Sequence, residues 1–246
     1  REKNVLLQVM RKLFTLNTNC LEIFVNIFDT QIQPIALYGS ELWGLDKKAI
    51  MHCESVHLLG LKKFLGVESR TPNDLVYGET NRYPIHINAA IRCVRYWLKI
   101  LKMENNRLPR KAYNMLYDLD LRGKFNWVSN IRVCLCELGF GYVWMYQGVE
   151  GENVFIRMVR QRMIDCRWQQ WESHIQASDR FDIYRMHSST HLVKEYILIN
   201  MDRYLRFIIT RFRLGITEIM VHAYRYKHVF STELLCPLCK ESNEDE

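Results

Sequence analysis

Apolar residues recur at helical spacing along most of this 246-residue chain, and this periodicity constrains the fold more than any other feature. The first such helix is expected near the start of the chain, with an apolar face made of Val5, Leu6, Val9, Leu13 and Leu16. Further patterns predict helices within 20–32, 47–66 and 84–103, after Pro109 through Tyr113 and Leu116, and within 129–138, 153–171, 191–200 and 202–213. No strand-like alternation between hairpin turns occurs, and no internal repeat is evident. The chain is therefore expected to be all-α.

Capping and turn residues divide this helical pattern. Asn19 and Glu22 form a capping-box-like pair, Asp46 is a good N-cap, and Gly66 is expected to end the helix that Asp46 begins. Thr71 followed by Pro72 predicts a cap and a first helical residue, which marks the best internal boundary. Residues 120–128 are expected to form a loop and 139–151 a glycine-broken linker. We expect a small helical bundle over 1–68, a larger irregular helical domain over 69–228 and a terminal Cys-x-x-Cys segment over 229–246.

Composition favours a folded chain without a membrane segment. Hydrophobic residues make up 48% and charged residues 25% of the sequence, enough for a buried core in one large or two small domains. No apolar run approaches the ~20 residues that a bilayer span needs, and the first residues show no signal-peptide pattern. The 8 cysteines are scattered through helical patterns, which suits an intracellular, reducing compartment.

Two helical patterns carry basic stripes. The formal net charge of +7 favours acidic partners such as nucleic acid. At about 100° per residue, one stripe contains Arg92, Arg95, Lys99 and Lys102, opposite the apolar Ile91, Val94, Trp97, Leu98 and Leu101. A second stripe contains Arg203, Arg206 and Arg213, beside Tyr204, Leu205, Ile208, Ile209 and Phe212. Together with Lys62 and Lys63, these cations are candidates for phosphate contacts. The alternative is that they form ordinary solvated helix faces.

The tryptophans are better explained as core residues. Aromatic rings can stack on the bases of single-stranded nucleic acid. Trp97 and Trp168, however, lie on the apolar sides of their predicted helices. We therefore expect packing rather than base stacking for most of these rings.

Cys236 and Cys239 have the spacing of half a tetrahedral zinc site. Two thiolates do not complete such a site. His222 and His228 lie upstream and could supply further ligands, although isolated histidines are more often surface or capping residues. The pair is therefore expected to be a partial metal site.

Signatures of catalysis are missing from the sequence. There is no turn with paired aspartates of the type that holds catalytic metal ions in polymerases, no glycine-rich phosphate loop and no nucleophile elbow. Asp118 and Asp120 are close in sequence, but a carboxylate cluster at a helix end explains them. We expect no catalytic activity from this chain by itself.

Several motifs occur in an order that resembles a known family. They begin with Pro34-Ile-Ala-Leu-Tyr-Gly-Ser-Glu-Leu-Trp-Gly44, Glu54-Ser-Val-His-Leu-Leu-Gly-Leu-Lys-Lys-Phe-Leu-Gly-Val67, Thr71-Pro-Asn-Asp-Leu-Val-Tyr-Gly-Glu79, Arg82-Tyr-Pro84 and Tyr96-Trp-Leu-Lys99. They continue with Asn126-Trp127, Gly139-Phe140, Trp144, Arg211-Phe-Arg-Leu-Gly215, Cys236-Pro-Leu-Cys239 and Glu244-Asp-Glu246. In this order they resemble the thumb and post-polymerase region of reverse transcriptases from non-long-terminal-repeat (LINE-type) retrotransposons.

This resemblance implies a role in positioning nucleic acid. The thumb-like bundle and the helical region after it would help hold template RNA and target DNA during target-primed reverse transcription, next to a polymerase core on the same polypeptide. The resemblance also implies Mg²⁺ in that core, Zn²⁺ if a histidine and a cysteine complete the knuckle downstream, and a nuclear or cytoplasmic location. The alternatives are a helical protein-interaction module and a decayed transposon remnant without activity.

Overall fold

The computed structural model describes residues 2–15, 20–187 and 194–216, and every regular element in these ranges is a helix. The first elements are α1 (Glu2–Thr15), α2 (Leu21–Ile27), the π-helical turn η1 (Phe28–Ile32), α3 (Gln33–Ala36), α4 (Ser40–Trp43) and α5 (Lys47–Leu65). They are followed by α6 (Asn73–Thr80), α7 (His86–Leu101), α8 (Leu108–Leu121), α9 (Trp127–Glu137), α10 (Gly141–Met145) and α11 (Glu152–Ala177). The last are the 3₁₀-helix η2 (Asp179–Phe181), α12 (Asp182–His187), α13 (Glu195–Leu198) and α14 (Arg203–Arg213). The prediction of an all-α fold is confirmed for the described residues.

The helices belong to two compact units, each built from separate stretches of sequence. Among the described residues, unit 1 takes 2–5, 28–57 and 83–169, and unit 2 takes 6–15, 20–27, 58–82, 170–187 and 194–216. These units cut across the division at residue 68 that turn residues suggested. The reason is that α5 and α11 each contribute one part to unit 1 and the other part to unit 2. Turn and capping residues act locally and do not indicate how segments distant in sequence pack together.

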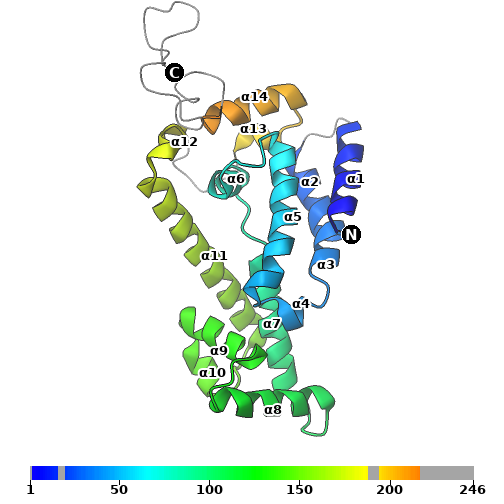
Figure 1. The fold of residues 1–246 in the computed structure, drawn as a ribbon, viewed down its shortest axis with the longest axis vertical. Helices are drawn as coiled ribbons and strands as arrows, with labels where there is room; N and C mark the ends of the chain where they lie inside the picture. Colours follow the sequence, from blue (N-terminus) through cyan, green and yellow to red (C-terminus); the bar gives the residue numbers. More distant parts are fainter. Residues whose placement is uncertain (1, 16–19, 188–193, 217–246) are drawn as a thin grey trace, which may run out of the picture. The chain divides into compact units, whose positions relative to one another are not determined.

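The core of unit 1 is built around α7. Trp97 is fully buried, its ring stacks on Trp144 with centroids 5.7 Å apart, and its indole N–H donates to the Tyr113 hydroxyl at 3.3 Å. Helices α8, α9 and α10 gather around this part of α7 (Figure 1), and α11 adds Phe155 and Val159 to the same cluster. The core role expected for Trp97 is therefore confirmed.

Helix α4 packs closely against α7 and explains the glycines of the first motif. A Cβ on Gly44 would lie 2.8 Å from the Ala89 carbonyl oxygen, so only glycine fits there. Gly39 precedes α4 with φ of 69°, in the left-handed region that favours glycine. The Cys93 thiol donates to the Ser40 carbonyl at 3.1 Å, and burial raises the pKa of Cys93 to about 12. This cysteine is a neutral packing group.

Capping chemistry fixes α9 beside α8. The Asn126 side chain accepts the Val128 N–H at 2.8 Å, and the Ser129 hydroxyl accepts the Asn126 N–H at 2.9 Å. Ser129 also donates to Asp120 at 2.5 Å, and Arg132 makes two hydrogen bonds to the same carboxylate. Asp120 thus has the structural role that its helix-end position suggested.

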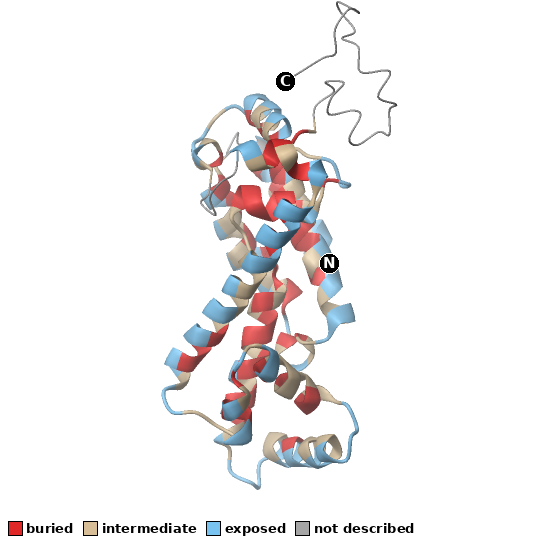
Figure 2. Cartoon of the chain, turned by 90° about the vertical axis from the view of Figure 1, so that its left-hand side faces the viewer, coloured by how far each residue is buried: buried red, intermediate tan, exposed pale blue. Residues whose placement is uncertain are grey.

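Unit 2 packs around α6, which is buried over Leu75–Thr80. The indole N–H of Trp171 donates to the Asp74 carbonyl at 2.8 Å, and a Cβ on Gly78 would lie 2.6 Å from the Trp171 ring. Phe24 and Phe64 stack in the same unit with centroids 5.4 Å apart. Figure 2 shows how buried and exposed residues alternate along the helices, as amphipathic packing requires.

Most predicted helix positions agree with the structure, and Asp46 caps α5 by accepting the N–H groups of Lys48 and Ala49. The linker prediction for 139–151 was wrong in part, because α10 forms there once Val143 and Trp144 are buried. The Thr71 cap was also wrong: α6 begins at Asn73, with Pro72 as N-cap and no side-chain cap bond. Pro72 has a ψ of 135°, outside the helical range, so it cannot be the first helical residue and the helix starts one position later than predicted. The predicted Asn19 cap lies outside the described residues, as does the start of the helix expected over 191–200.

No helix in the described ranges combines the length and the apolar character that a bilayer crossing requires.

Candidate nucleic-acid interface

The basic stripe of α7 lies on the solvent side of unit 1. Arg95, Lys99 and Lys102 are exposed, whereas Val94 and Trp97 are fully buried on the opposite side. The separation of charged and apolar faces predicted for this helix is confirmed. Because a packed core holds the apolar face, the three cations are carried on a fixed helical frame.

Arg92 does not join these exposed cations. Its guanidinium donates to the Leu37 carbonyl at 2.9 Å, at the C-terminal end of α3, and its side chain is half-buried. The same carbonyl accepts the Ser40 N–H at 3.1 Å, so the guanidinium is a second, charged donor to it. The structure therefore gives Arg92 a role in attaching α3 to α7.

A pocket of about 320 Å³ lies beside the three cations. Its walls come from α7 and from the start of α11, and we call it the α7 groove; it is lined by Arg95, Leu98, Lys99, Lys102, Glu152, Asn153 and Ile156. Within the described part of the chain, neither Arg95 nor Lys99 makes a side-chain hydrogen bond or ion pair. Both are therefore available to an anion that enters the groove.

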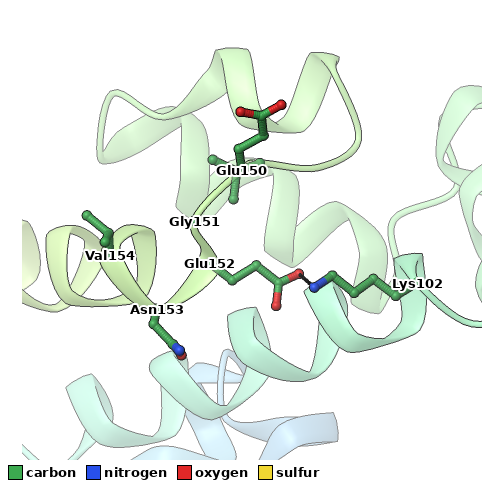
Figure 3. A pocket seen from close by; sticks show the side chains of 7 residues that line it. Lys102, Glu150, Gly151, Glu152, Asn153 and Val154 are labelled. Carbon is green, nitrogen blue, oxygen red and sulfur yellow. Dashed lines mark ion pairs between the residues drawn. The ribbon is translucent and has the colours of Figure 1, made fainter.

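A second pocket, of about 460 Å³, adjoins the α7 groove and shares Lys102, Glu152 and Asn153 with it (Figure 3). The rest of its lining comes from residues 149–154, where Gly151 has a φ of 69° immediately before α11. The Lys102 ammonium lies 3.0 Å from the Glu152 carboxylate. Glu152 and Asn153 were not among the site residues predicted from the basic helical stripes of the sequence. The signal that could have found Glu152 was an acidic residue directly after a glycine at a helix start, where the helix dipole favours negative charge.

The second predicted basic stripe, on α14 in unit 2, faces the protein interior and not the solvent. Arg206 is fully buried, and its guanidinium lies 4.2 Å from the centre of the Phe64 ring. Burial, together with the nearby Arg203 charge, lowers the pKa of Arg206 to about 10. Four of the five residues expected to face the core are exposed instead, Tyr204 at 71%, Leu205 at 54%, Ile208 at 46% and Phe212 at 42%, and Ile209 is half-buried. The predicted orientation of α14 was therefore wrong.

A buried carboxylate explains this orientation. Glu79 on α6 is fully buried and accepts hydrogen bonds from Arg213 Nε at 2.6 Å and from the Tyr196 hydroxyl at 2.7 Å. The same hydroxyl lies 2.9 Å from Thr210 Oγ1. Burial alone would lower the pKa of Arg213, but the hydrogen bond with Glu79 and the negative charge of that carboxylate together raise it above its ordinary value. Arg213 is therefore committed to a structural ion pair.

Arg203 and the lysines of α5 complete the predicted set. Arg203 is half-buried, with its guanidinium 4.7 Å from the centre of the Phe207 ring. Lys62 donates to the Ser69 carbonyl at 2.8 Å, and burial lowers its pKa, whereas Lys63 is exposed. Arg203, Lys62 and Lys63 belong to unit 2. Of the cations predicted to contact phosphate, Arg95, Lys99 and Lys102 are the ones that the structure leaves exposed and brings together within one unit.

The predicted zinc ligands Cys236 and Cys239 lie outside the described residues, as do His222 and His228. Within the described ranges, no group of three or more histidine, cysteine, aspartate or glutamate side chains is arranged to hold a metal ion. The partial zinc site therefore stays a prediction.

Unit 1 also has an apolar pocket of about 190 Å³, which we call the aromatic pocket. It is lined by Leu42, Tyr96, Ile100, Pro109, Ala112, Tyr113, Leu116 and Trp127. Trp127 is held in place by an indole N–H bond to the Glu41 carbonyl at 3.2 Å and by an edge contact with Tyr96. Leu42, at the rim, is 62% exposed. A surface of this kind suits an apolar side chain from another protein.

Comparison with known proteins identifies no relative: no protein-family model matches the chain, and neither a curated protein nor a solved structure is significantly similar to it.

Proposed function

We propose that this chain is a non-catalytic module that positions nucleic acid, with phosphate bound in the α7 groove. The observation that carries the proposal is the pair Arg95 and Lys99: both are exposed, both line one pocket with Lys102, and neither has a partner in the described part of the chain. With a rise of about 1.5 Å per residue, Arg95 and Lys102 lie about 10 Å apart along the helix axis. A strand of a B-form duplex advances about 3.4 Å along the duplex axis per nucleotide, so this length matches roughly three nucleotide steps of such a strand. A short stretch of phosphates therefore fits the stripe.

The resemblance to retrotransposon reverse transcriptases supports a particular setting for this activity. In that setting the chain would form the thumb and post-polymerase part of an RNA-directed DNA polymerase and help hold template RNA and target DNA. The motif residues around Gly44 and Asn126 support the same setting, because they build the frame on which α7 and α9 rest. The polymerase core with its Mg²⁺ would be the main protein partner.

The test is a variant with Arg95→Gln, Lys99→Gln and Lys102→Gln, assayed for binding to a labelled single-stranded oligonucleotide of about 20 nucleotides over a range of salt concentrations. Each lost phosphate contact should reduce the slope of log affinity against log salt by about 0.7. We expect a total reduction between about 1.4 and 2, because Lys102 is partly neutralised by Glu152.

A matched control removes the same charge elsewhere in unit 1. Lys111, Arg122 and Lys124 are exposed and line neither the α7 groove nor the aromatic pocket. Their triple glutamine variant should lose little affinity. Equal losses in the two variants would reduce the effect to net charge and refute a localised site.

Protein docking is the second candidate, and the aromatic pocket favours it. Apolar docking does not weaken steeply with salt, in contrast to phosphate binding. If the α7 variant binds nucleic acid with unchanged affinity and salt slope, docking through the aromatic pocket becomes the better explanation of unit 1.

A further inference from the structure

A carboxylate lies inside the α7 groove, beside its three cations. Glu152 lines both the α7 groove and the adjoining pocket, and its side chain points toward Lys102 (Figure 3). The two charged groups are 3.0 Å apart, with Lys102 69% and Glu152 30% exposed. An acidic residue at this position opposes the binding of any anion to Lys102.

The ion pair is of a kind that an incoming phosphate can open. Pairs between exposed side chains contribute little to stability, because water screens them and both side chains lose freedom. Glu152 is the first residue of α11, so its carboxylate keeps a favourable interaction with the helix N-terminus after Lys102 is released. The carboxylate thus has an alternative position close to the groove.

We propose that Glu152 is a built-in competitor for phosphate at Lys102 and sets the affinity of the α7 groove. This inference rests on the proposed function, since it assumes that the groove binds a phosphate strand. In the free protein the Glu152 carboxylate is paired with the Lys102 ammonium. The nucleic-acid strand must displace this carboxylate before Lys102 can contact a phosphate. The groove therefore binds through Arg95 and Lys99 first, and Lys102 contributes a reduced share.

The chain supplies a matched control for this role. Glu150 lines the adjoining pocket and carries the same charge, but its side chain points away from Lys102 (Figure 3). Glu150 is exposed and makes no ion pair in the described part of the chain. Glu150→Gln therefore reports the general effect of removing one negative charge near the groove.

The experiment measures oligonucleotide affinity and salt slope for Glu152→Gln, for Glu150→Gln and for each of these combined with Lys102→Gln. Glu152→Gln should bind about five-fold more tightly at low salt, with a salt slope steeper by up to about 0.7, because Lys102 becomes a full phosphate contact. Adding Lys102→Gln should abolish that gain. The smaller effect of Glu150→Gln should persist unchanged in the Lys102→Gln background.

The outcomes separate the two proposals. If Glu152→Gln gains no more than Glu150→Gln, or if its gain survives Lys102→Gln, Glu152 is not a competitor at Lys102 and the inference is overturned. The proposed function stands in that case, provided the triple α7 variant still loses binding. If the wild-type protein does not bind the oligonucleotide and none of these glutamine variants does either, the proposed function and the inference both fail.

Discussion

Replacing Glu79 by alanine should destabilise unit 2 by about 3 kcal/mol. Removing one partner of a buried ion pair usually costs about 3–5 kcal/mol, because the other charge is left uncompensated. The low end applies here, since the Arg213 side chain is 21% exposed and water can reach part of it. Glu79→Gln should cost less, roughly 1–2 kcal/mol, because the amide oxygen can still accept from the Tyr196 hydroxyl.

The assay is urea unfolding followed by circular dichroism and by tryptophan fluorescence, since two compact units need not unfold together. Glu68→Ala is the control, because Glu68 is an exposed residue of the same unit and should change stability by less than about 0.5 kcal/mol. A double-mutant cycle with Arg213→Ala should give a coupling energy of about 1–3 kcal/mol. If Glu79→Ala behaves like Glu68→Ala, or if its effect simply adds to that of Arg213→Ala, Glu79 does not organise α6 and α14 as the structure indicates.

Two further predictions concern Asp120 and the terminal cysteines. The hydrogen bonds from Arg132 outweigh the effect of burial and lower the pKa of Asp120 below its ordinary 3.8, so Asp120 stabilises the fold above that pH and loses this effect as pH falls through the lowered value. Asp120→Asn should therefore cost about 1–2 kcal/mol at neutral pH, and its difference from wild type should narrow in acid; a difference that stays constant into acid would contradict the pairing. Adding a chelator should leave the melting temperature nearly unchanged, because Cys236 and Cys239 have the spacing of only half a zinc site, whereas a complete structural site contributes roughly 10 kcal/mol or more. A large drop in melting temperature would show that His222, His228 or another group completes the site.

Periodicity predicted the helices well because each apolar face is encoded locally. The pattern around Trp97 needed no knowledge of the partner helices to place that ring in a core. The units could not be predicted in the same way, since α5 and α11 run through both and their packing partners are distant in sequence. Helix α10 shows the same limit on a small scale. Its five residues are too few for an apolar periodicity to be recognised in the sequence, and burial in the tertiary structure stabilises them as a helix.

The candidate site was predicted only in part for a related reason. Exposed cations can be read from a helical stripe, but their partners cannot, and partners decide which cations remain available. Arg92 donates to the carbonyl of Leu37, the residue that follows α3, and Lys102 is partly neutralised by the first residue of α11. Neither partner lies near in sequence or shares a helix with the cation it meets.

The contrast between α7 and α14 shows what decides the orientation of a basic amphipathic helix. Both helices carry cations on one side and apolar residues on the other, so sequence periodicity treats them alike. In α7 the apolar side includes Trp97, which fills a core of other rings, and the cations stay in water. In α14 the side with arginines meets Phe64 and the buried Glu79, and arginine can pack its stem and plane on a ring while its charge is compensated. A buried carboxylate elsewhere in the chain can thus determine which face of a basic amphipathic helix is buried. For this reason the case for phosphate binding rests on α7, whose exposed Arg95 and Lys99 meet no such carboxylate in the described residues.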